Sequence, residues 1–457
     1  MSAVDATTGP ETRLDLPPAA PSAGRALGHI LILAIPFALG AAVTSVLNLG
    51  KIALLSRVAD TGALTALSLL QPAFVLILAV MEGLAITNQV FSARSRKAWP
   101  RRGVLRASRR LSMVGLIVLT GIAALSYLAR YLIPADAVGL MQIVELLPGF
   151  VLSLTLFTVF DIYFGAMRGQ GKILLGLLPF AGLVAIDLAV TYVLVADYGL
   201  GFEAVLLGNL AGAGAMLPVI IWLLHREVKD GADSPDEPFR IRLRQLQIGV
   251  GLPVFSSLVV GFVSAAVAFP LLARLGQDVV ASFFVVLRYR IAFMIPAIAI
   301  GSAIAILVNQ AAEEGEGRTR LRYLVIGVPV MLLLYVGATL ALPHWSFMLD
   351  LLVPAEASAL RGATQGMLEL LLVTFFLVAG GAMLQVILEQ LGRGGQVLAI
   401  TVLTEFGTCA ALVWVTTEGA TVGRISQVLI GFAALSFGLL TLQFLLLLRK
   451  MRSADAV

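Results

Sequence analysis

Long apolar runs separated by short polar breaks account for most of the 457 residues of the chain. A helix crosses the hydrocarbon core of a bilayer with about 20 consecutive apolar residues, and twelve runs in this sequence approach or exceed that length. The pattern predicts an all-α polytopic membrane protein with twelve transmembrane helices. The predicted spans are 28–55, 62–92, 111–133, 143–166, 174–196, 202–224, 246–273, 279–310, 323–343, 362–389, 397–417 and 424–448.

The two halves of the chain resemble each other. A segment containing Pro36 matches one containing Pro253, and GLAITNQVFSA at 83–93 matches GSAIAILVNQAA at 301–312. Because each half contains an even number of spans, both halves have the same topology, as in transporters whose repeats are related by an axis along the membrane normal. We expect two six-helix pseudo-symmetric lobes around a central cleft.

One hydrophilic connection, at 227–245, has the composition of a linker and divides the chain between the two repeats. The predicted domains are therefore a disordered cytoplasmic tail at 1–25, an N-terminal lobe at 26–226 and a C-terminal lobe at 246–450. The tail lacks the basic region and short apolar region of a signal peptide. The first span is expected to serve as an uncleaved insertion signal.

Charge supports the membrane assignment and gives an orientation. Only 13% of the residues are charged, whereas soluble domains contain about 25%. With the N-terminus inside, 24 of the 32 lysine and arginine residues fall on the cytoplasmic side, as the positive-inside rule requires. Both termini are expected in the cytoplasm, and the protein in the cell inner (plasma) membrane. Orientation explains the basic clusters, so no nucleic-acid partner is predicted.

Motifs of enzymes and nucleotide-driven pumps are absent from the sequence. It contains no HExxH, GxSxG or CxxC, and GAMRGQGKI at 165–173 lacks the spacing of a phosphate-binding loop. The single cysteine, Cys409, and three scattered histidines give no metal site. We predict neither an enzyme nor a cofactor. The expected partners are a small organic substrate and the lipid bilayer, the expected state is a monomer, and uphill transport would depend on an ion gradient or the membrane potential.

Charged and polar residues inside the predicted spans are the candidates for a functional site. Lys51 interrupts the first span, and a lysine at a helix centre costs about 2.5–3.5 kcal/mol on insertion scales, so it usually faces water or a partner. Thr44, Asn48 and Lys51 lie on one helix face, and Asp187 and Thr191 are one turn apart on another. An ion pair between Lys51 and Asp187 would be either a functional element or a fixed structural pair, and Lys51 could instead extend toward the outer surface.

Other charged residues leave alternatives open. Glu82 either lines the same lobe or is a packing carboxylate, and Asp161 is expected to form a local salt bridge with Arg168. Arg288 and Arg290 point about 200° apart on a helix, so only one can face the cavity well. A structural role for this pair, bonding carbonyls or a carboxylate, is the alternative.

Several segments resemble the multidrug and toxic compound extrusion (MATE) family. Pro36 followed fifteen residues later by a polar position resembles its first helix, and MRGQGK and LGRGGQ resemble its loops after the fourth and tenth helices. Residues 185–212 resemble its fifth and sixth helices, and 287–318 its eighth. The resemblance covers about 26–450. It implies two six-helix lobes, a central cavity, and alternating-access export of organic, often cationic or amphipathic, molecules coupled to proton or sodium influx.

The resemblance also identifies departures from the family pattern. Family members often carry an acid at the position of Lys51, and some carry an aspartate at the position of Ala382. The family arrangement implies that Lys51 faces Asp187 inside the N-terminal lobe, with Arg290 as the arginine toward the cavity and Pro36 as a hinge. Because few oxygen ligands for sodium remain, a proton is the expected coupling ion. The alternative function is a lipid-linked saccharide flippase of the same superfamily.

Overall fold

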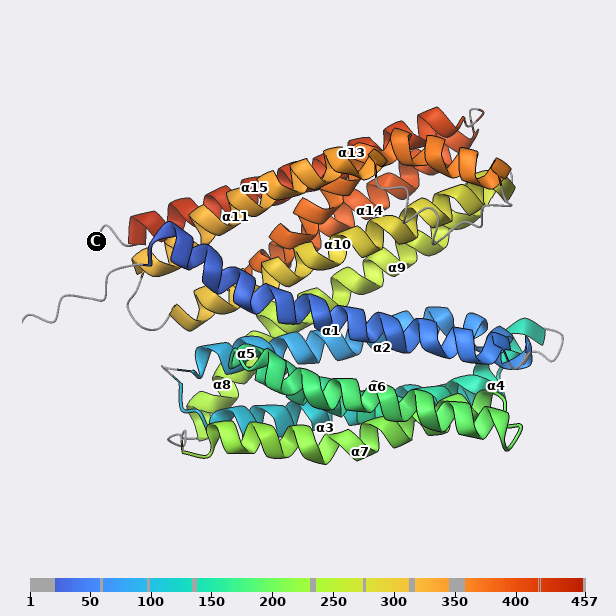
Figure 1. Cartoon of the computed structure of the whole chain (residues 1–457), viewed down its shortest axis with the longest axis horizontal. Helices are drawn as coiled ribbons and strands as arrows, with labels where there is room; N and C mark the ends of the chain where they lie inside the picture. Colours follow the sequence, from blue (N-terminus) through green and yellow to red (C-terminus); the bar gives the residue numbers. More distant parts are fainter. Residues whose placement is uncertain are drawn as a thin grey trace, which may run out of the picture.

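The computed structural model describes residues 21–57, 61–96, 99–133, 138–230, 236–273, 277–311, 317–344, 358–417, 419 and 421–454. All regular secondary structure in these residues is helical. The described helices form two bundles that lie one above the other in Figure 1. The predicted twelve-helix membrane fold is confirmed, and each lobe contributes six spans.

The N-terminal lobe contains six spans, of which the fourth is broken. α4 and α5 are bent by 42° at Leu154 and together cross the lobe once. Pro148 lies six residues before this break, within α4. The helices of this lobe are α1 (Ala23–Arg57), α2 (Thr61–Arg94), α3 (Gly103–Ala129), α4 (Val138–Ser153), α5 (Thr155–Gly169), α6 (Ile173–Ala196) and α7 (Phe202–Val228).

The C-terminal lobe follows a helix that lies within the segment predicted as a linker and packs, through Phe239 and Leu243, in the core of the N-terminal lobe. Residues Asp236–Leu246 form helix α8, which continues through a π-helical turn at Gln247–Gly251 into the seventh span. A second π-helical turn, at Glu389–Arg393, separates the tenth and eleventh spans. The spans of this lobe are α9 (Leu252–Ala273), α10 (Gln277–Ala311), α11 (Gly317–Ala341), α13 (Ser358–Leu388), α14 (Gly394–Thr417) and α15 (Val422–Ala454).

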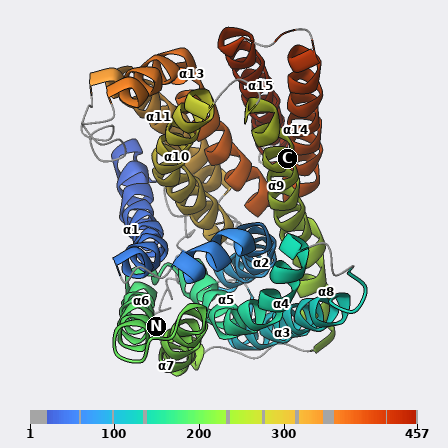
Figure 2. The ribbon, with the colours of Figure 1, turned by 90° about the vertical axis from the view of Figure 1, so that its right-hand side faces the viewer.

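Helix α1 joins the two lobes. Near its start, Ala26 and Ile30 are fully buried in a hydrophobic core otherwise built by the C-terminal lobe, and His29 Nδ1 lies 2.9 Å from the hydroxyl of Tyr323 on α11. Near its end, Leu47 packs in the core of the N-terminal lobe. Figure 2 shows α1 running beside α10 at one end and α6 at the other. The buried Pro36 lies between these two anchored portions.

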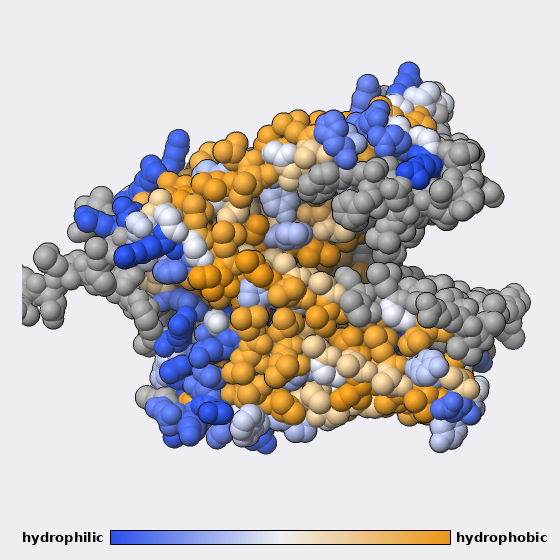
Figure 3. All heavy atoms as spheres, in the orientation of Figure 1, coloured by the Kyte–Doolittle hydropathy of each residue, from blue (hydrophilic) through white to orange (hydrophobic). Residues whose placement is uncertain are grey.

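The surface divides into an apolar band and two different ends. Figure 3 shows hydrophobic residues around the middle of the molecule, as expected where a protein faces lipid. Hydrophilic residues gather at the end where α15 finishes; we call this the basic end, since it carries the arginines of 94–110. At the opposite end, which we call the open end, a wedge-shaped cleft separates the lobes (Figure 3).

Candidate functional site

A buried ion pair joins α1 to α6 inside the N-terminal lobe. The ammonium of Lys51 lies 2.8 Å from Oδ2 of Asp187. Lys51 is 8% exposed and Asp187 is 1% exposed. Gly50 permits this approach, because a Cβ atom there would lie 3.1 Å from the side chain of Leu188. The structure thus brings together the two charged residues that the sequence placed in separate spans.

Three neutral side chains complete the hydrogen bonding of this pair. Lys51 also donates to Oδ1 of Asn209 on α7, and Asn209 Nδ2 donates to the Ser153 hydroxyl at 3.0 Å. The Thr191 hydroxyl donates to Oδ1 of Asp187 at 3.3 Å. Four helices therefore meet at one buried polar network, which consists of Lys51, Asp187, Thr191, Asn209 and Ser153. Such hydrogen bonding is what makes a buried ion pair tolerable, because each charge keeps several partners.

Two glycines on α7 bring that helix against the network. A Cβ atom on Gly208 would collide with the Thr191 hydroxyl and lie 2.7 Å from Oδ1 of Asp187. A Cβ atom on Gly212 would lie 2.6 Å from the carbonyl oxygen of Leu183. Small residues four apart are the usual means of close helix packing in a membrane. Gly208 and Gly212 therefore set the separation of α6 and α7 at which Asn209 reaches Lys51.

Replacing Gly208 by alanine is expected to separate α6 from α7 and weaken the polar network. The added methyl group meets Asp187 and Thr191, and overpacking of this kind typically costs about 1–3 kcal/mol. Gly214→Ala on the same helix is the matched control, because a Cβ atom there meets only a Leu156 methyl group at 3.6 Å. Melting temperature in detergent should fall for Gly208→Ala and stay near wild type for Gly214→Ala. Equal melting temperatures of the two variants would contradict this packing role.

The other candidate residues of the N-terminal lobe are not among the members of this polar network. Thr44 and Asn48 lie on α1, but their side chains are outside the described part of the structure. Glu82 on α2 is half-buried and contributes negative potential at Asp161 on α5. Asp161 in turn pairs with Arg168 at 3.8 Å, as predicted. Glu82 thus belongs to a second charged group, separate from the ion pair of Lys51.

Arg290 occupies the other lobe. Its Nη1 donates to the Thr374 hydroxyl on α13 at 3.3 Å, and Glu405 on α14 lies within electrostatic range. The side chain of Arg288 is outside the described part of the structure. The arginine is therefore held by helices of the C-terminal lobe, and the structure does not place it with Lys51 and Asp187.

A second polar cluster closes the basic end between the lobes. Gln89 Nε2 on α2 donates to Gln390 Oε1 at 3.0 Å, and Gln310 Nε2 on α10 donates to the carbonyl of Gly169 at 3.0 Å. Two arginines of the N-terminal lobe add bonds to the C-terminal lobe, from Arg94 Nε to Asn309 Oδ1 at 3.1 Å and from Arg96 Nη1 to Gln310 Oε1 at 2.8 Å. We call this cluster the cross-lobe latch; its members are Gln89, Arg94, Arg96, Gly169, Asn309, Gln310 and Gln390.

The cross-lobe latch follows the internal repeat. Gln89 and Gln310 come from the matching Asn-Gln pairs of the two halves, each on the second span of its lobe. Each glutamine bonds to the end of the fourth span of the opposite lobe, where Gly169 and Gln390 lie. All four polar side chains of Gln89, Asn309, Gln310 and Gln390 are buried. The basic end is therefore sealed by two related contacts, while the other end is open.

Comparison with known proteins identifies the fold. No family model matches the sequence, and no curated protein matches it. Solved structures match over nearly the full length: a MOP superfamily transporter from Pyrococcus furiosus has a TM-score of 0.80 at 16% identity, over 95% of this chain and 99% of that chain. A Vibrio cholerae MATE transporter has a TM-score of 0.81 at 14% identity, covering 94% and 98%. A multidrug resistance MATE transporter in an outward-facing conformation has a TM-score of 0.75 at 16% identity, covering 95% and 99%.

The chain therefore has the fold of these solved MATE and MOP superfamily structures. The sequence indicated Lys51, Asp187 and Thr191, but it did not single out Asn209 or Ser153. Asn209 could have been noticed beside Gly208 in the GNLAG motif at 208–212, because small residues four apart indicate a close helix contact. Ser153 carries no comparable indication.

Proposed function

We propose that the protein is a secondary active transporter of MATE type. It exports organic, often cationic or amphipathic, molecules by cation antiport, and a proton is the coupling ion in preference to sodium. The observation that carries the proposal is the buried ion pair of Lys51 and Asp187 on a transporter fold. Placing ionisable residues inside the bilayer is energetically costly, so residues that remain there point to a function. The proton relays of pumps and transporters are built from such residues.

With one end open and the other closed, the molecule has the arrangement of one state of an alternating-access cycle. The cleft is open at one end, and the cross-lobe latch closes the other. The positive-inside rule puts the basic end in the cytoplasm, so this state is open to the outside. A cycle then requires the latch to break as the lobes rock and the open end to close.

The polar network favours a proton over sodium. The ammonium of Lys51 already occupies the position between Asp187 and Asn209 where a bound cation would find its oxygen ligands. Protonation of Asp187 removes the charge that holds Lys51, and the end of α1 is then held to α6 less strongly. Because α1 is anchored in both lobes, a change at this end alters the balance between the two states.

A flippase for lipid-linked saccharides is the second candidate. Lys51 is a base at a position where the resemblance to the MATE family implies an acid. The Pyrococcus furiosus transporter of similar fold is described as having a binding pocket of reverse polarity that suggests a different function. Inside-out vesicles with a fluorescent cationic dye and imposed pH or sodium gradients distinguish the candidates. Dye uptake with proton flux supports the exporter. Lipid translocation without dye uptake would overturn it in favour of the flippase.

Pro36→Ala is expected to reduce transport several-fold more than it reduces expression. A proline frees a backbone carbonyl and lets a helix bend, and Pro36 lies between the portion of α1 packed in the C-terminal lobe and the portion packed in the N-terminal lobe. Dye uptake in vesicles, normalised to the amount of protein, measures the effect. An equal loss of transport and of protein amount would show that Pro36 has only a folding role.

A further inference from the structure

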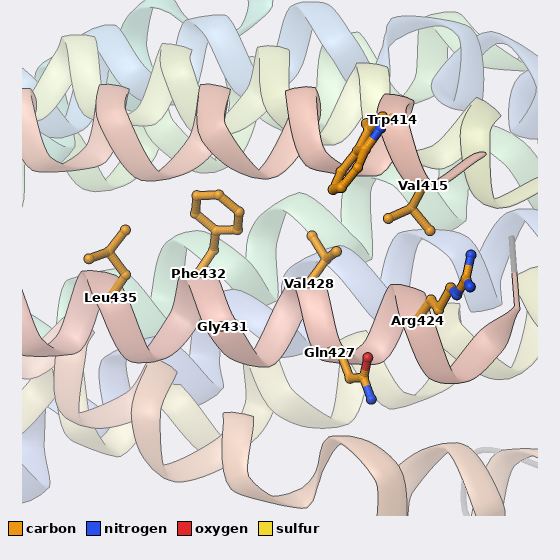
Figure 4. A pocket seen from close by; sticks show the side chains of 8 residues that line it. All are labelled: Trp414, Val415, Arg424, Gln427, Val428, Gly431, Phe432 and Leu435. Atoms are coloured by element: carbon orange, nitrogen blue, oxygen red, sulfur yellow. The ribbon is translucent and has the colours of Figure 1, made fainter. Parts of the chain in front are cut away.

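An open crevice runs between α14 and α15 near the open end of the molecule. Its volume is about 640 Å³, within the range of about 300–1,000 Å³ that takes drug-sized ligands. Figure 4 shows Trp414 on α14 and Val428, Phe432 and Leu435 on α15 facing one another across the gap. The crevice is separate from the cross-lobe latch and from the polar network of Lys51.

The crevice has a closed inner limit and an open slot above it. A Cβ atom on Gly407 of α14 would lie 2.5 Å from the ring of Phe432, so the ring rests on this glycine and the two helices touch there. Gly431 directly precedes Phe432 on α15, and a Cβ atom on Gly431 would meet nothing within 4 Å. The helices therefore pack closely at Gly407 and separate toward the open end, which leaves an elongated apolar slot.

The side chain of Arg424 places a positive charge at the outer end of the slot. Arg424 lies in the first turn of α15, and among the described residues none bonds to its guanidinium, while its backbone N–H is bonded to the Thr421 hydroxyl. Trp414 lies in the last turn of α14 and is 63% exposed. Tryptophan is enriched at the level of lipid headgroups. The crevice thus combines a cation at the headgroup level with an apolar slot below it.

We propose that this crevice binds one anionic phospholipid from the membrane leaflet at the open end. The guanidinium of Arg424 donates bidentate hydrogen bonds to the lipid phosphate, a geometry for which arginine is well suited. The acyl chain fills the slot along Val428 and Gly431 as far as the ring of Phe432, where hydrocarbon rather than water is the available solvent. The ring of Trp414 covers the acyl chain just below the lipid headgroup. This assignment does not depend on the transported substrate.

Brominated lipids test the proposal, because bromine quenches tryptophan fluorescence on contact. Wild type and Trp414→Phe are placed in nanodiscs with acyl-brominated phosphatidylglycerol or acyl-brominated phosphatidylcholine at increasing fractions. The difference between the two proteins gives the quenching of Trp414, since the other three tryptophans are common to both. Half-maximal quenching should need roughly fivefold less phosphatidylglycerol than phosphatidylcholine, the effect of one arginine near a membrane surface.

Two variants locate the site, each measured against its own Trp414→Phe version. Arg424→Gln should remove the preference for phosphatidylglycerol, whereas Arg130→Gln should keep it; Arg130 is a half-buried arginine just after α3 at the same end. Gly431→Leu should fill the slot and reduce quenching by both lipids, whereas Gly438→Leu on the same helix should not. Equal quenching of wild-type Trp414 by the two lipids would overturn the proposal, as would a preference that survives Arg424→Gln.

Discussion

Asp187→Asn should abolish coupled transport and lower the stability of the protein. The substitution leaves the ammonium of Lys51 buried without a counter-charge, with Asn209 as its remaining partner in the network. Removing one member of a buried ion pair typically costs about 3–5 kcal/mol. Proton-driven dye uptake in proteoliposomes should fall to background, and the melting temperature should drop by several degrees. Uptake equal to wild type would contradict a coupling role for Asp187.

A double variant separates function from stability. Lys51→Met with Asp187→Leu removes both charges at once, and replacing a buried ion pair by apolar residues is often neutral or stabilising. Its melting temperature should return toward that of wild type, while proton-driven uptake stays at background. Full recovery of transport in the double variant would show that the pair is only structural. Lys51→Met alone should resemble Asp187→Asn in transport, since either change breaks the same contact.

Breaking the cross-lobe latch should shift the protein toward the state that is open at the basic end. The double variant Gln89→Ala with Gln310→Ala removes three bonds between the lobes, because Gln310 also accepts a bond from Arg96. A neutral hydrogen bond contributes about 1 kcal/mol net, so the loss of the two neutral bonds alone corresponds to roughly a 30-fold change in the ratio of the two states, and the loss of the bond from Arg96 adds to it. Gln89→Ala alone should give roughly a fivefold change, and Gln310→Ala alone a larger one, because it also removes the bond from Arg96.

Spin labels at the basic end measure this shift. Asp230, just after α7, and Ser453, near the end of α15, are exposed positions in different lobes, and Cys409→Ala removes the single native cysteine. In the double variant a longer distance between the labels should become populated. Gln365→Ala is the control, because Gln365 bonds to Glu369 within α13 and lies outside the latch. An unchanged distance distribution in the double variant would contradict the role of the latch.

The sequence was sufficient for the helices and for two contacts, those of Lys51 with Asp187 and of Asp161 with Arg168. Hydropathy predicted the spans, because a bilayer imposes their length, and Lys51 and Asp187 stood out since charges inside a membrane are costly. Asn209 and Ser153 could not be found in this way. They are neutral, and they matter only because Gly208 brings α7 to the right distance, which the sequence of one helix does not reveal.

Packing between lobes was the least predictable part. The repeated Asn-Gln pairs were visible, but hydropathy does not say that Gln89 reaches Gln390 or that Gln310 reaches Gly169. These bonds depend on the tilt of whole lobes. Likewise, the pattern of α1 gives a membrane span, whereas the burial of Ile30 among residues of the C-terminal lobe depends on the three-dimensional arrangement.

The reciprocal bonds of the latch have the geometry of an isologous interface, in which the same patch of each subunit contacts the other. In a dimer of half-length chains, one substitution in the Asn-Gln pair would have weakened both contacts together. In the fused chain, Gln89 and Gln310 are independent positions, and their partners already differ: one is the side chain of Gln390 and the other the backbone of Gly169. Fusion thus lets the two halves of the seal be adjusted separately, which a symmetric dimer cannot do.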